Sequence, residues 1–322
     1  ATAAVEETLK GAWGGAPAKV LDEFEAEPFA LTAAAQLHRG QYDGTPVVVK
    51  VRRPGVERSV RNDLVLLDAL AGPLRSAFPN LDAAAVLRDV REQALDELDF
   101  EHEASTQRRV ARALRAVDGV TVPRPLLDLS TSDVLVSERA EGTTLADGAR
   151  PADAGAAARA LIGAFRAAVL EAGLAPVDLR ASHVVVGPAD ELALLGMGVS
   201  RPVDRARAER ALDVLDALAA GDAGAFGARV AESGVLGADE AMAAHAVLRD
   251  VAGPLVDGPA VLDADAVREL GVRAWSAAPT LTSLATAAAP HPEDLALGRM
   301  LGQLAAVLSR LGAREDWVTL TR

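Results

Sequence analysis

Cysteine is missing from this chain of 322 residues, and aromatic residues make up only 3% of it. Without cysteine, a disulfide-stapled fold and thiol chemistry are excluded, and a structural zinc site is not expected because cysteine thiolates usually complete such sites. Hydrophobic residues nevertheless make up 50% of the sequence. The core must therefore be built from alanine, leucine and valine, and the length suits one large domain or two ordinary ones.

Long apolar runs and excess positive charge are also absent. The sequence holds no uninterrupted apolar stretch of about 18 residues, so it predicts no transmembrane segment. Its first residues, ATAAVEETLK, have neither the basic start nor the apolar stretch of a signal peptide. The formal net charge of −13 disfavours nucleic acid as a partner. We expect a cytoplasmic protein that at most lies on a membrane surface.

Lysine is scarce as well, because arginine carries nearly all of the positive charge. One of the few lysines, Lys50, lies in the β-branched run VVVKV, which predicts a strand. Alternation along a strand places Val49 and Val51 on one face, and Val48, Lys50 and Arg52 on the other. The residues alone leave two interpretations open. Lys50 points to solvent from an edge strand, or it faces a phosphate and is oriented by a glutamate.

Candidate glutamates lie in the segment ELDFEHEA. Glu97 and Glu101 are four residues apart and are predicted to share one helix face, with Glu103 turned away from them. A run of acidic residues is usually a solvated helix face. The spacing alone does not decide between a solvated face and a partner for Lys50.

Hydrophobic periodicity and turn residues predict a mixed first part and a mostly helical remainder. Asp43 and Gly44 indicate a hairpin turn that leads into the run Val47 to Val51. A second hairpin is expected from the apolar runs 184–186 and 192–195, with Asp190 and Glu191 in its turn. The remaining predicted elements are strands over 120–129 and 133–142 and helices over 4–27 (with a break at Gly14 and Gly15), 56–71, 82–117, 152–173, 204–219, 222–233, 238–251, 263–277 and 292–312.

The order of these elements is that of a protein-kinase-like fold, and four segments narrow it further. VVVKVRRPGVERSVRNDLVLL resembles the "VAVKVQRPG…D" segment of the UbiB/AarF family of atypical kinases, and DELDFEHEASTQRR resembles its "ELDFxxEAxN" helix. VPRPLLDLSTSDVLVSERAEGTTL resembles the family's "VPRVxxxLSTxxVLxMExxxGxxL" stretch. RALDVLDALAAGDAGAFGARVAESG resembles the helical pair that follows its catalytic hairpin. The resemblance covers roughly residues 5 to 235.

This resemblance implies an α+β, bilobal fold. We expect a small α+β N-lobe over residues 1–139, a mostly helical C-lobe over 140–235, and extra C-terminal helices over 236–322 packed on the C-lobe. The family's "KxGQ" helices would precede residue 5, and the chain does not contain them.

In the N-lobe the resemblance implies a nucleotide loop and a hinge. FALTAAAQLHRG matches the family's alanine-rich loop, written "AAASIGQVHRA". Gln36 and His38 are kept, whereas Ala35 stands where the family has glycine. The segment 137–140, with Glu138 and Ala140, would be the hinge that offers backbone groups to adenine.

The resemblance also chooses between the two interpretations of Lys50. It implies that Lys50 contacts the phosphates of ATP and pairs with a helix glutamate, for which Glu103 is the best match. Glu97 and Asp99 would be the additional acidic pair of the family.

The C-lobe hairpin departs from the family pattern "HADPHPGNLLV…LALLDFG". Asp178 matches the catalytic aspartate, but His183 stands at the magnesium-binding asparagine and Gly196 at the aspartate that is the principal magnesium ligand. Magnesium prefers oxygen ligands, so the altered pair predicts poor metal binding. Arg180 replaces a histidine and would neutralise phosphate charge, which favours ATP binding over turnover.

Simpler interpretations of the same residues stay open. His183 would be a hydrogen-bonded residue at the rim of the strand, and Asp178 would cap its loop through backbone N–H groups. Gly196 and the two residues after it would then form an ordinary turn.

The resemblance, with both metal-ligand positions altered, implies a pseudokinase that acts through binding. Its partner would be another protein, and ATP or an isoprenoid or lipid-like ligand are the candidate small molecules. A second hypothesis is a residual ATPase or small-molecule kinase with a rearranged metal site. A third is a structural scaffold whose helical half, residues 204–312, binds another protein.

Overall fold

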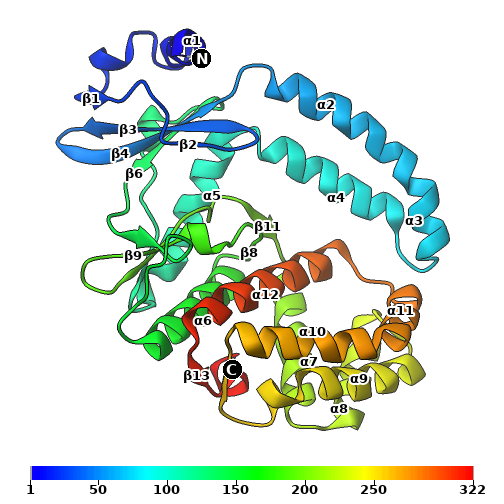
Figure 1. The fold of residues 1–322 in the computed structure, drawn as a ribbon. Helices are drawn as coiled ribbons and strands as arrows, with labels where there is room; N and C mark the ends of the chain where they lie inside the picture. The colour runs from blue at the N-terminus through cyan, green and yellow to red at the C-terminus, as the bar shows by residue number, and fades with distance from the viewer. Residues whose placement is uncertain (1, 322) are drawn as a thin grey trace.

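A computed structural model describes residues 2–321 and shows a chain folded into two lobes (Figure 1). The first lobe is built on an antiparallel sheet, and the second is mostly helical. This is the kinase-like α+β arrangement that the sequence predicts.

The sheet of the N-lobe contains five strands in the order β1-β3-β4-β6, with β2 also paired to β3. The strands are β1 (Glu23–Phe24), β2 (Ala30–Leu31), β3 (Ala35–Tyr42), β4 (Thr45–Arg52) and β6 (Val134–Glu138). The turn between β3 and β4 holds Asp43 and Gly44 at φ values of 49° and 72°, which a type I′ hairpin turn requires. The predicted hairpin is confirmed.

Helix α1 (Thr2–Trp13) covers one face of this sheet. The cluster that it buries consists of Val5, Leu9, Leu21, Val47, Val49, Val51, Val134 and Val136. The predicted break at Gly14 and Gly15 is confirmed, but the prediction that an α-helix continues beyond it to residue 27 is wrong. Gly14 takes a left-handed φ of 67°, and Pro17 then starts a 3₁₀ turn (Pro17–Lys19) that leads into β1.

A helical arm leaves the sheet after β4 and returns to it (Figure 1). It consists of α2 (Val56–Leu67), a 3₁₀ turn (Asp68–Leu70), α3 (Ala71–Ala77), α4 (Ala83–Asp96) and α5 (Phe100–Ala113). The single predicted helix over 82–117 is wrong, because the chain breaks between α4 and α5. Asp99 causes the break: its side chain accepts from the N–H groups of Glu101 and His102 and caps α5.

The second lobe has a small four-stranded sheet in the order β5-β10-β9-β7, and a separate pair of β8 with β11. β9 (Val184–Val186) and β10 (Leu192–Leu194) form the predicted second hairpin. The other strands are β5 (Val120–Thr121), β7 (Thr143–Thr144), β8 (Leu174–Pro176) and β11 (Ser200–Pro202), and 3₁₀ turns span Leu114–Ala116 and Ala181–His183. A further 3₁₀ turn, Leu127–Leu129, packs on β6 of the N-lobe. The strand predicted over 120–129 is therefore only two residues long.

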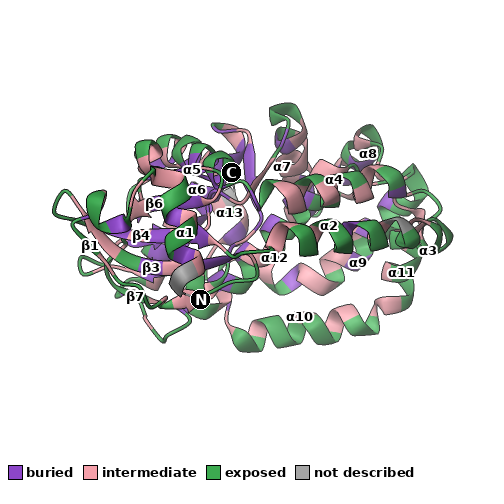
Figure 2. Cartoon of the chain, turned by 90° about the horizontal axis from the view of Figure 1, so that it is seen from above, coloured by how far each residue is buried: buried purple, intermediate pink, exposed green. Residues whose placement is uncertain are grey.

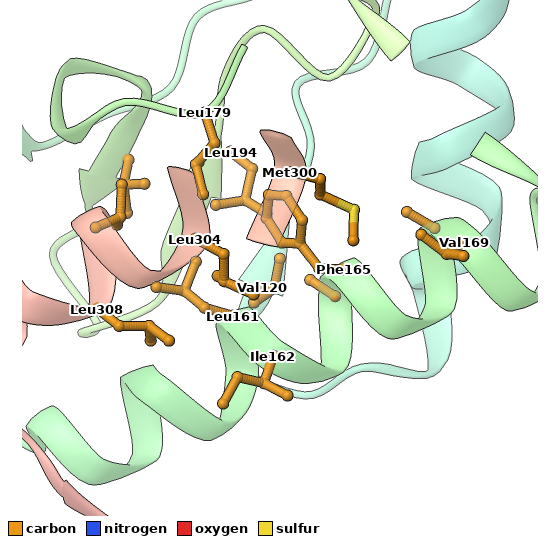
Figure 3. Close-up of a cluster of buried hydrophobic side chains, with 14 of the residues drawn as sticks. Val120, Leu161, Ile162, Phe165, Val169, Leu179, Leu194, Met300, Leu304 and Leu308 are labelled. Carbon is orange, nitrogen blue, oxygen red and sulfur yellow. The ribbon is translucent and has the colours of Figure 1, made fainter. Parts of the chain in front are cut away.

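Helices α6 (Ala154–Leu170) and α12 (Pro292–Leu311) pack together at the centre of this lobe. Leu161 and Phe165 of α6 lie against Met300, Leu304 and Leu308 of α12 (Figure 3). Residues beyond 235 therefore share one core with the first helix of the lobe. The remaining elements are α7 (Arg205–Ala219), α8 (Ala223–Ser233), α9 (Ala238–Val256), β12 (Ala260–Val261), α10 (Ala264–Ser276), α11 (Ala278–Ala287), β13 (Arg314–Glu315) and α13 (Trp317–Thr321).

Burial is uneven across the two lobes (Figure 2). Buried residues recur along β3, β4 and β6 and along α6, whereas α10 lies on the outside and contributes no buried residue. Among the helices between residues 2 and 321, none combines the length and the apolar character that crossing a bilayer requires.

Candidate functional site

Lys50 and Glu103 form a doubly hydrogen-bonded ion pair on the N-lobe side of the candidate site. The ammonium group of Lys50 donates to both carboxylate oxygens of Glu103, at 2.8 and 2.6 Å. It also lies 4.4 Å from the centre of the Phe100 ring. Glu103 is only 7% exposed, so the two charges hold each other in a largely dry environment.

The position of β4 explains why Lys50 faces inward. β4 is hydrogen-bonded to β3 on one side and to β6 on the other, so it is a central strand and Lys50 is not an edge lysine. Val49 and Val51 point to the face that α1 covers, and Lys50 points to the opposite face, toward α5. The structure thus brings Lys50 and Glu103 together, as the resemblance implied.

Glu97 and Asp99 do not join this pair. Glu97 ends α4 on the exposed surface, where it accepts from the side chain of Gln93, and Asp99 caps α5. The prediction that Glu97 and Glu101 share one helix face is wrong, since they belong to different helices. Asp99 therefore has a structural role at the break between α4 and α5, whereas Glu97 lines a small pocket that Glu103 also lines.

The residues of the alanine-rich loop enter β3 directly. Ala35 is fully buried at its start, and Gln36 is 8% exposed. His38 is completely buried, stacks on Phe24, and its Nδ1 lies 2.9 Å from the carbonyl oxygen of Glu25. Since a carbonyl only accepts, Nδ1 carries the proton. Burial lowers the pKa of His38, and its Nε2 has no hydrogen-bond partner, so this histidine is a neutral core residue.

The predicted hinge lies where β6 ends. The N–H group of Glu138 donates to the carbonyl of Arg124, and that of Arg139 donates to the carbonyl of Pro46. The carboxylate of Glu138 also pairs with the Arg124 side chain. These two hinge N–H groups are therefore used within the protein, and Ala140 follows them in the segment toward the C-lobe.

On the C-lobe side, Asp178 follows β8 and is held by its own neighbours. Its carboxylate accepts from Nε of Arg180 at 3.0 Å and from Nη2 at 2.5 Å. Its backbone oxygen lies 2.6 Å from Nδ1 of His183, which is therefore the protonated ring nitrogen. His183 is thus a hydrogen-bonded rim residue, and Asp178 forms an ion pair with Arg180.

His183 occupies the space beside Gly196. A Cβ atom added at residue 196 would lie 2.8 Å from Nδ1 of His183 and 3.1 Å from its Cε1. Gly196 also has a left-handed φ of 71°, which a side chain disfavours. An aspartate at this position would therefore require the imidazole to move. The two departures from the family pattern fit each other sterically.

The donor set on this side does not fit a magnesium ion. Only Asp178 offers a carboxylate, and it is neutralised by Arg180. No group of three metal-ligating side chains occurs within residues 2–321. Asp190 lies in the hairpin turn, where it accepts from the N–H groups of Ala152 and Asp153, so it is engaged elsewhere.

The loop after β10 connects the two sides of the site. At Gly198 a Cβ atom would lie 2.6 Å from the backbone oxygen of Glu103, so only glycine allows this close approach to α5. A pocket of about 20 Å³ lies there, lined in part by Glu103, Gly198 and Arg201. That volume holds about one water molecule, whereas ligand pockets measure about 300–1,000 Å³. Arg201 also bonds Asp89 and Asp96, which ties the arm to this loop.

Gln303 of α12 supports the Asp178 loop, although no local pattern of the sequence indicates this role. Its side-chain amide donates to the carbonyl of Val177 at 2.9 Å and accepts from the N–H of Leu179 at 3.0 Å. The two bonds flank Asp178 and fix the peptide groups on both sides of it. This contact spans more than 120 residues of chain, which local patterns cannot anticipate.

Comparison with known proteins gives one family match and several partial relatives. A family model described as the ABC1 atypical kinase-like domain matches residues 1–228. An uncharacterised protein of Mycobacterium tuberculosis, Rv0647c, is 32% identical over 201 residues, which are 59% of this chain and 41% of that protein. A probable protein kinase UbiB from Marinobacter nauticus is 35% identical over 138 residues, 41% of this chain and 25% of the relative. The chain thus spans less than half the length of these curated relatives.

A solved structure supports the fold. The structure of Rv3197 from Mycobacterium tuberculosis in complex with erythromycin matches with a TM-score of 0.75 and covers 99% of this chain and 82% of its own. The sequence identity is 19%, so this likeness concerns the fold alone.

Proposed function

This chain belongs to the ABC1 atypical kinase-like family, and from that premise we propose that it is a pseudokinase that acts through binding. Its function would depend on holding a partner protein, with a nucleotide in the cleft as the regulating ligand. Transfer of the phosphoryl group would be impaired.

The contact between His183 and Gly196 carries this proposal. Phosphoryl transfer depends mainly on positioning and on neutralisation of charge by magnesium. Here the ring of His183 fills the space beside Gly196 where the family's metal-binding carboxylate would stand. The ion pair with Arg180 further lowers the availability of Asp178 as an acceptor for a substrate proton.

ATP is proposed as the nucleotide because the N-lobe side keeps its polar groups. Lys50 is oriented by Glu103, and Gln36 lies beside Ala35 at the start of β3. Arg180 is 60% exposed and adds a second cation on the other side. In this proposal Lys50 and Arg180, each paired with a carboxylate in the structure, would also donate to phosphate oxygens in place of magnesium.

Binding of ATP is tested by calorimetric titration in EDTA and in magnesium. We expect saturable binding of similar strength under both conditions, and its loss in Lys50→Met. Lys19→Met, a change of the same type at an exposed lysine, should leave binding unchanged. Absence of binding at millimolar ATP would overturn the nucleotide part of the proposal.

The second candidate is a residual ATPase or small-molecule kinase with a rearranged metal site. The retained Asp178 and the intact pair of Lys50 and Glu103 favour it. Strong enhancement of ATP binding by magnesium in the titration would support this candidate over a pseudokinase.

A further inference from the structure

A cavity of about 720 Å³ lies on the N-lobe, away from the candidate nucleotide site. Helix α1 forms one wall, and the end of β4 with the first turns of α2 forms the other. Lys50 does not line it. The polar residues that carry the argument are Glu7, Arg52, Arg53, Glu57, Arg58 and Arg61. The volume falls within the range of small-molecule sites, about 300–1,000 Å³.

The charge of this cavity is opposite to that of the molecule. The whole chain has 46 acidic and 33 basic residues, but the cavity is lined by four arginines and three carboxylates. Arginine presents a planar set of donors that matches phosphate and carboxylate groups. An arginine excess within an acidic protein therefore indicates an anionic ligand.

The pairing of these groups shows which charges are left for a ligand. Arg61 bonds Glu57, and this bond, together with the charges of Arg61 and Arg52, lowers the pKa of Glu57. The side chain of Arg52 forms an ion pair with Asp133 and donates a hydrogen bond to the carbonyl of Leu98. Within residues 2–321, the side chain of Arg58 has neither a hydrogen bond nor an ion pair, and it is exposed and lines the cavity.

The start of α2 adds to the attraction for an anion. Gly55, at a φ of 78°, ends the strand segment and turns the chain into α2, and both Gly55 and Arg58 line the cavity. The positive end of a 12-residue helix is thus directed at the same space as the free guanidinium group. On the opposite wall, Glu7 of α1 is a carboxylate without an ion pair among the described residues, and it suits a donor or a cation on the ligand.

We propose that this cavity binds a small molecule that carries a phosphate group and a hydroxyl or ammonium group. Arg58 and the start of α2 bind the phosphate group, and the carboxylate of Glu7 accepts a hydrogen bond from the hydroxyl or ammonium group. The same chemistry occurs in a free phosphorylated metabolite and in a phospholipid headgroup.

Isothermal titration of the 322-residue protein with O-phosphoethanolamine, inorganic phosphate and ethanolamine tests the proposal. We expect saturable binding of O-phosphoethanolamine, weaker binding of phosphate and none of ethanolamine. Arg58→Ala should weaken both phosphate-containing probes about tenfold, which is about 1.4 kcal/mol. Glu7→Gln should lower the affinity for O-phosphoethanolamine to that for inorganic phosphate.

Two control variants show whether binding is specific to this cavity. Arg115→Ala and Lys19→Met, at an exposed arginine and an exposed lysine outside the cavity, should both bind O-phosphoethanolamine like the unchanged protein. Absence of saturable binding, or equal binding by Arg58→Ala, would overturn the proposal. Sedimentation with vesicles that contain phosphatidylethanolamine, lost in Arg58→Ala, would identify a lipid headgroup as the source, and binding of the soluble probe alone would identify a metabolite.

Discussion

The N-lobe side and the C-lobe side of the candidate site differ in how their charged groups are arranged. On the N-lobe side, Lys50 and Glu103 form the paired charges of a kinase-like fold, 2.6 Å apart and largely buried. On the C-lobe side, Asp178 is retained, but Arg180 neutralises it and His183 fills the space beside Gly196. The N-lobe side therefore has a cation oriented by a buried carboxylate, whereas the C-lobe side has a carboxylate that is already paired with an arginine.

The difference teaches that the residues of the C-lobe side support one another through direct contacts. Gly196 leaves room for the imidazole of His183, and the imidazole bonds the backbone of Asp178. Gln303 fixes the same backbone from α12. The Asp178 loop is therefore held in place from two sides, by His183 and by Gln303.

The largest expected effect on stability tests whether the core of the C-lobe is tightly packed. Phe165 is 1% exposed between α6 and α12, so Phe165→Ala should lower the free energy of unfolding by about 3–5 kcal/mol. Trp275, at 82% exposure, is the matched aromatic control, and Trp275→Ala should change the free energy of unfolding by less than about 0.5 kcal/mol. Chemical denaturation measures both. If both variants lowered the free energy of unfolding by similarly small amounts, the core between α6 and α12 would be loosely packed.

The contact between His183 and Gly196 can be broken directly. Gly196→Asp should cost about 2–3 kcal/mol of unfolding free energy, from overpacking against the imidazole and from the left-handed backbone. In a double-mutant cycle, adding His183→Ala should recover at least about 1 kcal/mol. Additive costs in the cycle would mean that the two replacements are independent.

On the N-lobe side, the ion pair should contribute measurably to stability. Glu103→Gln leaves Lys50 without a counter-charge in a mostly buried position and should cost about 2 kcal/mol, less than a fully buried pair because Lys50 is 20% exposed. Glu101→Gln, the same change on the exposed face of α5, should cost less than about 0.5 kcal/mol. Thermal and urea unfolding compare the two, and equal effects would argue against a buried pair.

The smallest expected effect concerns pH. Because burial lowers the pKa of His38 in the folded state, the unfolded chain binds more protons as the pH falls below about 6.5. The contribution of His38 to stability is therefore complete above that pH and is lost as the pH falls toward its folded pKa. His38→Asn should flatten the pH dependence of the unfolding free energy, and the exposed His102→Asn should not. An unchanged slope in His38→Asn would contradict a neutral, buried His38.

Local patterns predicted much of this molecule. The turn at Asp43 and Gly44 and the face of Lys50 followed from alternation and turn chemistry, and the family motifs predicted the partner Glu103. The break between α4 and α5 was missed because hydrophobic periodicity continues across it. Asp99, a residue typical of helix N-caps, was the available signal.

The remaining features depend on contacts between distant segments. Helix α11 (Ala278–Ala287) was not predicted, since Ala277 starts it without a side-chain cap and it follows α10 directly. The fit of His183 to Gly196 and the support by Gln303 join residues that share no local pattern. The sequence motif drew attention to His183 and Gly196, but only the structure showed that the two residues lie against each other.

Single-turnover hydrolysis of ATP in magnesium, compared between the unchanged protein and Asp178→Ala, tests the proposed loss of catalysis most directly. If the C-lobe side no longer supports phosphoryl transfer, both proteins should hydrolyse ATP at the same background rate while still binding it through Lys50. Magnesium-dependent hydrolysis by the unchanged protein that disappears in Asp178→Ala would contradict this loss and establish a working catalytic site.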